Sequence, residues 1–205
     1  MYTYLKPFLV REELLKRNIK IFTPDLFSRV FGTSKEQSKY FLENQVKEGL
    51  LARLKKGIYT LKTDFPAEEE IANALYKPSY ISFEYALAYY DMLPEMPYIV
   101  TSATTKPTRL FNTPYMSFAY YTIKREAYSG YSLIKSGEKS FLMAEPEKAL
   151  VDYLYFESIG KKPYNDRLIL KGLDKNKLLD YADLYQRKSL NETVKEIVKK
   201  YYDNS

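Results

Sequence analysis

Residues 19–61 read IKIFTPDLFSRVFGTSKEQSKYFLENQVKEGLLARLKKGIYTL, and this stretch decides the fold of the N-terminal part of the chain. Its Thr23-Pro24-Asp25 predicts a helix start, because Thr caps a helix, Pro suits the first helical position and Asp complements the positive end of the helix dipole. We expect this helix to run from Pro24 to about Phe31 and to end at Gly32.

A second helix is predicted to begin directly after a short turn. Ser34 and Gln37 have the spacing of a capping box, and Gly49 stands where a C-terminal cap belongs. Two helices joined by a tight, Gly-containing turn form a helix-turn-helix. The inward face of the second helix is expected to consist of Ser38, Phe41, Leu42 and Val46.

A short β-hairpin is predicted to follow this helix pair. The runs 50–54 and 58–61 are β-prone, and Lys55-Lys56-Gly57 between them is a loop with Gly where a positive φ is needed. Residues 19–22 are expected to add a small third strand, and residues 1–18 an initial helix. The order helix, strand, helix, helix, hairpin is that of a winged helix.

The distribution of charge favours a nucleic-acid partner for this module. Residues 1–62 hold thirteen Lys and Arg against six Asp and Glu, a net charge of +7, whereas residues 63–205 hold nineteen against twenty, a net charge of −1. The positive excess of the chain therefore falls in the predicted winged helix, which favours binding to double-stranded DNA. A winged helix that contacts another protein remains the alternative.

Three groups of side chains are candidates for contacts with DNA. Gln and Asn can form paired hydrogen bonds with adenine in the major groove, while Lys and the positive helix end position the phosphate backbone. The candidates for base reading are Gln37, Tyr40 and Asn44. Those for the backbone and the flank of the helix are Thr33, Ser34, Lys35, Lys39 and Lys47, and those in the wing are Arg53, Lys55 and Lys56. Among the twenty-two tyrosines, Tyr40 and Tyr59 are the candidates for stacking on bases.

The composition argues against an enzyme. The chain has no Cys and no His, which removes thiol catalysis, Cys-ligated zinc and the usual general base. With seven Gly and no glycine-rich phosphate loop, no metal, cofactor or catalytic residue is expected; only Ser–Lys or carboxylate schemes remain, and no motif singles one out. No apolar run reaches the length of a membrane span and no signal-peptide core is found, so a cytoplasmic location is expected.

The remainder of the chain is predicted to form two further regions. Residues 62–66 are a boundary, followed by a helix over 68–75 whose acidic start complements the helix dipole. Residues 67–157 are expected to form an α+β domain with a helix that Ser82 caps and that runs to about Tyr90. Residues 158–205 are expected to form a helical extension packed on it. The domain should also contain a strand over 97–104, hairpins over 110–123 and 131–144, and a helix from Pro146; the extension should contain helices over 174–185 and 189–202.

Several stretches together resemble the AbiEi family, the antitoxins of bacterial AbiE (type IV) toxin–antitoxin and phage-abortive-infection systems. The resemblance covers most of residues 7–157. It is carried by YISFEYALAYY (80–90), LPE (93–95), VTSATTK (100–106), AEPEKALVD (144–152), EGLL (48–51), Arg53 and KGIY (56–59).

The resemblance implies a transcriptional regulator that represses its own operon by binding operator repeats through the winged helix. It also implies that the second domain counteracts a nucleotidyltransferase-like toxin, in many members without a stable complex. Lys106, Arg109 and Lys148 match polar positions of the family in that domain, although loop or helix-surface charge would explain them too. The alternative is a ligand-responsive winged-helix regulator without a toxin partner.

The expected fold class is therefore α+β. It comprises an N-terminal winged helix-turn-helix over residues 1–62, a mixed α/β domain with antiparallel hairpins, and the C-terminal helical tail.

Overall fold

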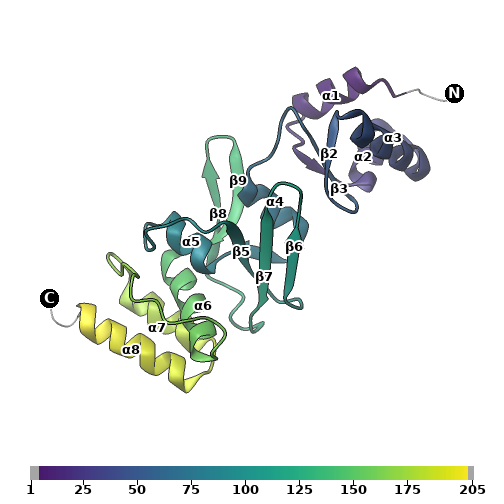
Figure 1. Ribbon diagram of the computed structural model, residues 1–205. Helices are drawn as coiled ribbons and strands as arrows, with labels where there is room; N and C mark the ends of the chain where they lie inside the picture. Colours follow the sequence, from purple (N-terminus) through teal and green to yellow (C-terminus); the bar gives the residue numbers. More distant parts are fainter. Residues whose placement is uncertain (1–4, 203–205) are drawn as a thin grey trace. The chain divides into compact units, whose positions relative to one another are not determined.

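The computed structural model describes residues 5–202, which form eight helices and two β-sheets (Figure 1). A mixed α+β class is therefore confirmed. The chain divides into two compact units, Met1–Leu75 and Tyr76–Ser205. The sequence had suggested a boundary at residues 62–66; the helix that follows those residues instead belongs with the first unit.

The first unit has the expected order of elements. A three-stranded antiparallel sheet, in the order β1-β3-β2, is accompanied by four helices. The predicted small third strand pairs with the hairpin through Ile21 opposite Thr60. Its elements are α1 (Pro7–Lys16), β1 (Ile21–Phe22), α2 (Pro24–Phe31), α3 (Lys35–Glu48), β2 (Leu51–Lys55), β3 (Ile58–Leu61) and α4 (Glu68–Leu75).

The predicted helix ends are present in the first unit. The side chain of Thr23 accepts a hydrogen bond from the backbone N–H of Leu26 at 3.3 Å, which caps α2. Gly32 ends α2 with a φ of 64°, a left-handed conformation that Gly adopts without a steric penalty. A complete capping box opens α3, and Gly49 closes it in the left-handed region.

An aromatic core fixes α2 and α3 against the small sheet. The ring of Phe27 lies 5.5 Å from that of Phe41 on α3, and the ring of Phe22 lies 6.4 Å from that of Tyr59 on β3, measured between centroids. Phe22, Phe27 and Leu42 are almost completely buried. Because the apolar side of α3 is used in this core, its opposite side is presented to solvent.

The second unit contains a six-stranded mixed sheet in the order β6-β7-β5-β4-β9-β8. Both predicted hairpins are present, as the antiparallel pairs β6–β7 and β8–β9. The elements are β4 (Ser79–Ile81), α5 (Phe83–Tyr89), β5 (Ile99–Thr104), β6 (Arg109–Asn112), β7 (Ser117–Thr122), β8 (Tyr131–Ser136), β9 (Lys139–Ala144), α6 (Pro146–Ser158), α7 (Lys175–Asp183) and α8 (Lys188–Tyr202).

Two features of this sheet were not predicted. Strand β4 is a central strand, whereas the sequence predicted no strand before the helix that starts at Ser82. Strands β5 and β7 pair in parallel over six residues, because the chain passes beyond β7 to form β6 before it returns. The pairing of β4 with β9 is also parallel. Parallel neighbours need a crossover connection, which local sequence patterns do not reveal.

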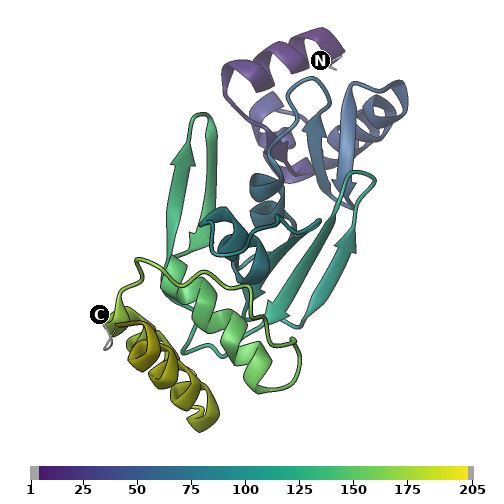
Figure 2. The same cartoon turned by 60° about the vertical axis from the view of Figure 1, so that its left-hand side comes forward.

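The C-terminal helices pack within the second unit, as expected. Helices α7 and α8 contact α6 and each other, and Figure 2 shows the three side by side. Within residues 5–202, none of the helices has both the length and the apolar character needed to cross a lipid bilayer.

Candidate nucleic-acid interface

The start of α3 is held by side chains that were candidates for contact with DNA. The hydroxyl of Ser34 accepts from the backbone N–H of Gln37 at 3.2 Å, and the side-chain oxygen of Gln37 accepts from the backbone N–H of Ser34 at 3.0 Å. A paired contact with adenine needs both the oxygen and the nitrogen of the amide. Gln37 therefore cannot make that contact while the capping box is closed.

Thr33 also has a structural role in the turn between α2 and α3. Its hydroxyl lies 2.7 Å from that of the buried Ser38, and its carbonyl oxygen accepts a hydrogen bond from Ser28. These contacts fix the angle at which α3 leaves the turn. Thr33 is half-buried, so it supports the helix more than it extends into solvent.

The positive end of α3 already holds a carboxylate. The backbone N–H of Glu36 and the side chain of Ser34 donate hydrogen bonds that lower the pKa of Glu36. Lys35 lies 3.4 Å from the carboxylate of Asp25, and both side chains are exposed. A phosphate at this helix end would therefore have to compete with these two acidic side chains.

The middle of α3 presents one strongly exposed aromatic ring. Tyr40 is 72% exposed, whereas Tyr59 is 4% exposed and stacks on Phe22 in the core. Burial raises the pKa of Tyr59. The interpretation of Tyr59 as a base-stacking residue is therefore wrong, and Tyr40 remains a candidate. Asn44 is half-buried on the same helix.

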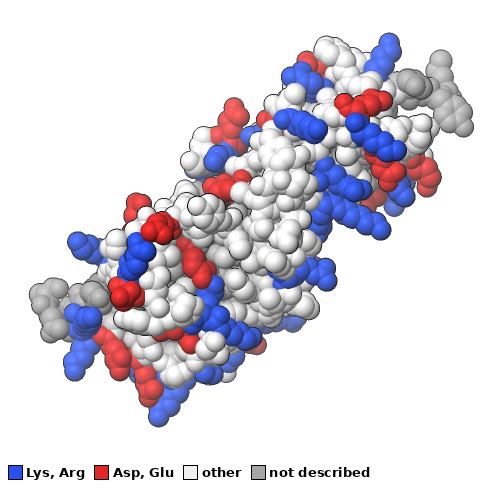
Figure 3. Space-filling model, in the orientation of Figure 1, with Lys and Arg blue, Asp and Glu red and all other residues white. Residues whose placement is uncertain are grey.

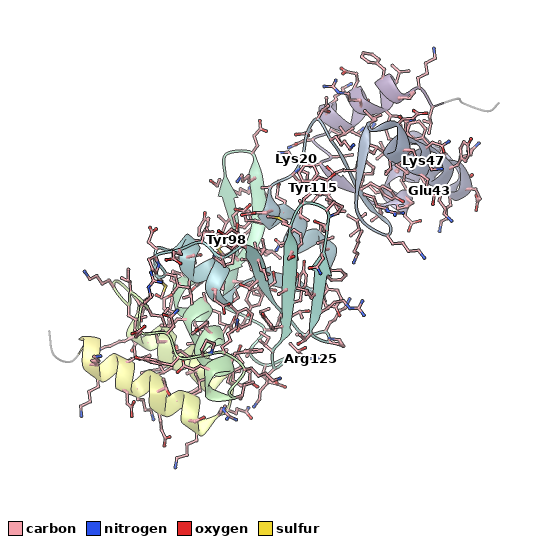
Figure 4. The ribbon with its side chains drawn as sticks, in the orientation of Figure 1. Lys20, Glu43, Lys47, Tyr98, Tyr115 and Arg125 are labelled. Carbon is pink, nitrogen blue, oxygen red and sulfur yellow. The ribbon has the colours of Figure 1, made fainter. Side chains whose placement is uncertain are left out.

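Helix α3 and the β2–β3 hairpin share one surface. A shallow hollow of about 290 Å³ lies between them, and Figure 4 shows two of its side chains, Glu43 and Lys47, on α3. Arg53, an exposed residue of β2, lines the same hollow. The helix and the hairpin therefore place basic side chains beside one another, together with Glu43, which the sequence analysis did not consider. The hollow is lined by Glu43, Val46, Lys47, Arg53 and Tyr59.

The two lysines of the predicted wing differ in their surroundings. Lys56 is exposed at the turn of the hairpin. Lys55 is half-buried, and its ammonium group donates a hydrogen bond to the carbonyl oxygen of Leu75 at the end of α4. The expectation that Lys55 extends toward a DNA groove is therefore corrected, because this contact directs it toward α4. Figure 3 shows Lys and Arg side chains gathered over the position of this hairpin in Figure 1.

The charge asymmetry predicted from the sequence depends on where the chain is divided. Residues 1–75 hold thirteen Lys and Arg against ten Asp and Glu, and residues 76–205 hold nineteen against sixteen, so each structural unit carries a net charge of +3. Asp64 and the three glutamates at the start of α4 cause the difference from the division at residue 62. On α3 itself the exposed charges balance, with Lys35, Lys39 and Lys47 against Glu36, Glu43 and Glu48.

Lys148 is not a surface charge, in contrast to the expectation for this position. It lies on α6 with no exposed side-chain surface and forms an ion pair with Asp152, which is equally buried. Burial lowers the pKa of Lys148, and the carboxylate of Asp152 acts in the opposite direction. No partner could reach this ammonium group without opening the core of the second unit.

The carboxylate of Asp152 is the centre of a buried polar cluster. One of its oxygens accepts from Lys148 and from the hydroxyl of Tyr185 at 2.5 Å, and the other accepts from Tyr80 at 3.0 Å and from Ser82 at 2.7 Å. Ser82 was expected to cap α5, but its side chain makes no capping bond. Its hydroxyl donates a hydrogen bond to Asp152 instead. The cluster thus connects β4, α5, α6 and the chain after α7.

Lys106 and Arg109, the other two candidates in this unit, are exposed. The ammonium group of Lys106 lies 5.4 Å from the centre of the Tyr76 ring, and the guanidinium of Arg109 lies 5.9 Å from the same ring. Both cations therefore lie near the same aromatic ring. Unlike Lys148, both are accessible to solvent.

A scan of protein-family models and a search of curated proteins found no match to this chain. The functional conclusion therefore depends on the arrangement of these residues and on the resemblance in the sequence.

Proposed function

We propose that this protein is a DNA-binding regulator whose first unit acts as a winged helix and represses the operon that encodes it. We further propose, from the resemblance to AbiEi antitoxins, that its second unit counteracts a nucleotidyltransferase-like toxin.

One observation carries the DNA-binding proposal. Lys47 of α3 and Arg53 of β2 line the same hollow, so the exposed side of the second helix and the basic hairpin belong to one surface. A helix that lies in a groove beside a hairpin that contacts the flanking phosphates requires such an arrangement. The core contacts of Phe27 and Phe41 hold α2 and α3 in a fixed relation beneath this surface.

The contacts on α3 revise the roles of its residues. Tyr40 and Asn44 are the candidates for reading bases, since Gln37 is engaged in the capping box. Thr33 and Ser34 preorganise the helix start instead of binding directly. The phosphate contacts are assigned to exposed cations only: Lys39, Lys47, Arg53 and Lys56.

The first experiment measures the affinity of the full chain for a fluorescein-labelled duplex that contains its own promoter region, by anisotropy over a range of salt concentrations. Replacing Arg53 and Lys56 with Ala should lower the magnitude of the slope of log K against log salt by about 1.8, since each lost phosphate contact removes about 0.9. The control Lys6→Ala/Lys16→Ala removes the same charge from exposed positions around α1. Equal slopes for the wild type and the Arg53/Lys56 variant would contradict the proposal.

The second experiment co-expresses the protein with the product of the neighbouring reading frame and scores recovery from growth arrest. Because neutralisation is assigned to the second unit, Arg53→Ala/Lys56→Ala should lose promoter repression and still restore growth. If the intact protein never restores growth, the antitoxin assignment fails while DNA binding can still hold.

A further inference from the structure

The topology of the second unit gathers five exposed cations at one end of its sheet. The hydroxyl of Thr104 at the end of β5 donates to the carbonyl of Pro78 at 2.7 Å, and the backbone N–H of Ile123 donates to the carbonyl of Thr104 at 2.9 Å. The hydroxyl of Thr122 donates to the carbonyl of Lys106 at 2.8 Å. These bonds hold together the beginnings of β4 and β6 and the ends of β5 and β7. We call the cations there the basic end: Lys77, Lys106, Arg109, Lys124 and Arg125.

The segment that supplies most of the basic end contains no acidic residue. From Met96 to Arg125 the sequence has neither Asp nor Glu, and the next acidic residue is Glu126. Lys124 donates a hydrogen bond to the carbonyl oxygen of Tyr185 at 2.5 Å. The acceptor in this bond is neutral, so it does not cancel the charge of the ammonium group. The five cations of the basic end exceed the net charge of +3 of the second unit, so the rest of that unit carries a net negative charge.

Lys106 and Arg109 are ordered before any partner arrives. Both cations lie over Tyr76, and Arg109 also lies 5.8 Å from the centre of the Phe111 ring. The hydroxyl of Tyr76 donates to the carbonyl of Pro107 at 3.1 Å, which fixes the loop between the two cations. Cations that are already held in place lose less conformational entropy on binding an anion.

The opposite end of the same strands has a different character. Figure 4 shows Tyr115 at the turn between β6 and β7, far along the strands from Arg125, which follows β7. Tyr115 is exposed there, and so is Ile99, which lies opposite Ser117 at the start of β7. The basic end is thus a local feature of the sheet, not a property of its whole edge.

We propose that the basic end binds the phosphate backbone of the same duplex DNA that the first unit binds, an inference that rests on the proposed function. Nucleic acid is favoured over an acidic protein because the cations follow one another along several strand ends, as consecutive phosphates do along a backbone. Lys and Arg at this end bind phosphate without reading sequence. The first unit reads the site, and the second increases affinity for it.

Two phosphate-binding surfaces in one chain would act together. Once the first unit is bound, the second meets the DNA at the high effective concentration that a short connection provides. Affinity then exceeds what the first unit supplies alone, without any new base contact.

The test compares three variants of the full chain in the anisotropy titration with the labelled promoter duplex, between roughly 50 and 200 mM salt. Lys106→Ala/Arg109→Ala should lower the slope magnitude by about 1.8 and weaken binding roughly 10- to 60-fold near 0.1 M salt. Lys106→Arg/Arg109→Lys, which keeps both charges, should restore the slope. The control Lys135→Ala/Lys199→Ala removes two exposed charges elsewhere in the unit and should leave it unchanged. Circular dichroism confirms that each variant is folded.

The outcomes separate this inference from the proposed function. If Arg53→Ala/Lys56→Ala weakens binding and Lys106→Ala/Arg109→Ala does not, the basic end does not bind DNA, an acidic protein becomes its expected partner, and the proposed function stands. If only the Lys106/Arg109 variant weakens binding, the phosphate site stands and the first unit loses its assigned role. If the wild type binds no duplex even at the lowest salt concentration, both are overturned.

Discussion

Helices α3 and α6 both carry charged side chains of both signs, yet the surroundings of these charges differ completely. On α3 three lysines and three glutamates are all exposed, whereas on α6 Glu147, Lys148 and Asp152 are buried. Helix α3 packs on α2 and a small sheet through one side only. Helix α6 is covered by α5 as well as by α7 and α8, so little of its surface remains for solvent.

The comparison shows that the charge of a helix does not reveal its role. Exposed ion pairs contribute little to stability, so the charges of α3 are free to serve binding. A buried pair is different, because its desolvation must be offset by good geometry and further hydrogen bonds. Asp152 receives four such bonds. We therefore expect changes at α6 to affect folding and changes at α3 to affect DNA binding.

Raising the pH is expected to have the largest effect, because it acts on several tyrosines of the second unit at once. Burial raises the pKa of Tyr90, Tyr153 and Tyr181 to about 12. In the unfolded chain tyrosine titrates near 10. Between about pH 10 and 12 the folded state therefore keeps protons that the unfolded state has lost, so the free energy of unfolding falls as the pH rises.

Tyrosinate absorbance and far-ultraviolet circular dichroism, followed together through this pH range, test the expectation. Ionisation of these tyrosines and loss of structure should occur together. Complete ionisation near pH 10 with the fold intact would show that the rings are not buried as described.

Removing the centre of the buried cluster should have the next largest effect. Asp152→Ala leaves the buried amino group of Lys148 without its ion-pair partner, which typically costs about 3–5 kcal/mol. Urea unfolding monitored by circular dichroism measures this loss. Asp180→Ala, at an exposed position on α7, should change the free energy of unfolding by no more than about 0.5 kcal/mol. Similar losses for both variants would remove the distinction between buried and exposed charge.

Two glycines, one in each unit, allow the packing of the two units to be compared. A Cβ atom at Gly130 would lie 2.7 Å from the ring of Tyr181 and 3.0 Å from Cγ of Lys148, while one at Gly32 would meet nothing within 4 Å. Both residues have a positive φ. Ala at Gly32 should therefore cost about 1 kcal/mol of backbone strain, and Ala at Gly130 about 2–4 kcal/mol, because overpacking is added. Thermal unfolding of the two variants gives the order, and a reversed order would contradict it.

The smallest effect is expected at the capping box of α3. Ser34→Ala removes one cap and should destabilise the first unit by about 1 kcal/mol, while Lys39→Ala on the same helix should be close to neutral. Urea unfolding measures both. The two variants should rank in the opposite order by DNA affinity. Lys39→Ala should bind DNA more weakly than Ser34→Ala, because Lys39 is assigned to a phosphate contact. If Ser34→Ala reduces affinity more than Lys39→Ala, the start of α3 contacts DNA directly.

Local signals in the sequence predicted the helix ends well. Thr23, Ser34 and Gly49 act through bonds to residues three or four positions away, so short patterns suffice to find them. The hairpin around Gly57 was predicted for the same reason.

Contacts between distant residues account for what was missed. The engagement of Lys55 depends on Leu75, twenty residues later, and the burial of Lys148 depends on the chain after α7. A central strand as short as β4 has too few residues to show a periodic pattern. The balance of charge between the units also depends on a boundary that only packing defines.

The bond from Tyr185 to Asp152 has a consequence for how the chain is made. The two residues lie 33 positions apart, so the carboxylate emerges from the ribosome well before its last partner. A chain without Tyr185 lacks one of the four hydrogen-bond donors to this buried carboxylate. A chain truncated before α7 would thus lack Tyr185, and the carboxylate of Asp152 would not be fully covered. Incompletely folded products of this kind are substrates of quality-control proteases.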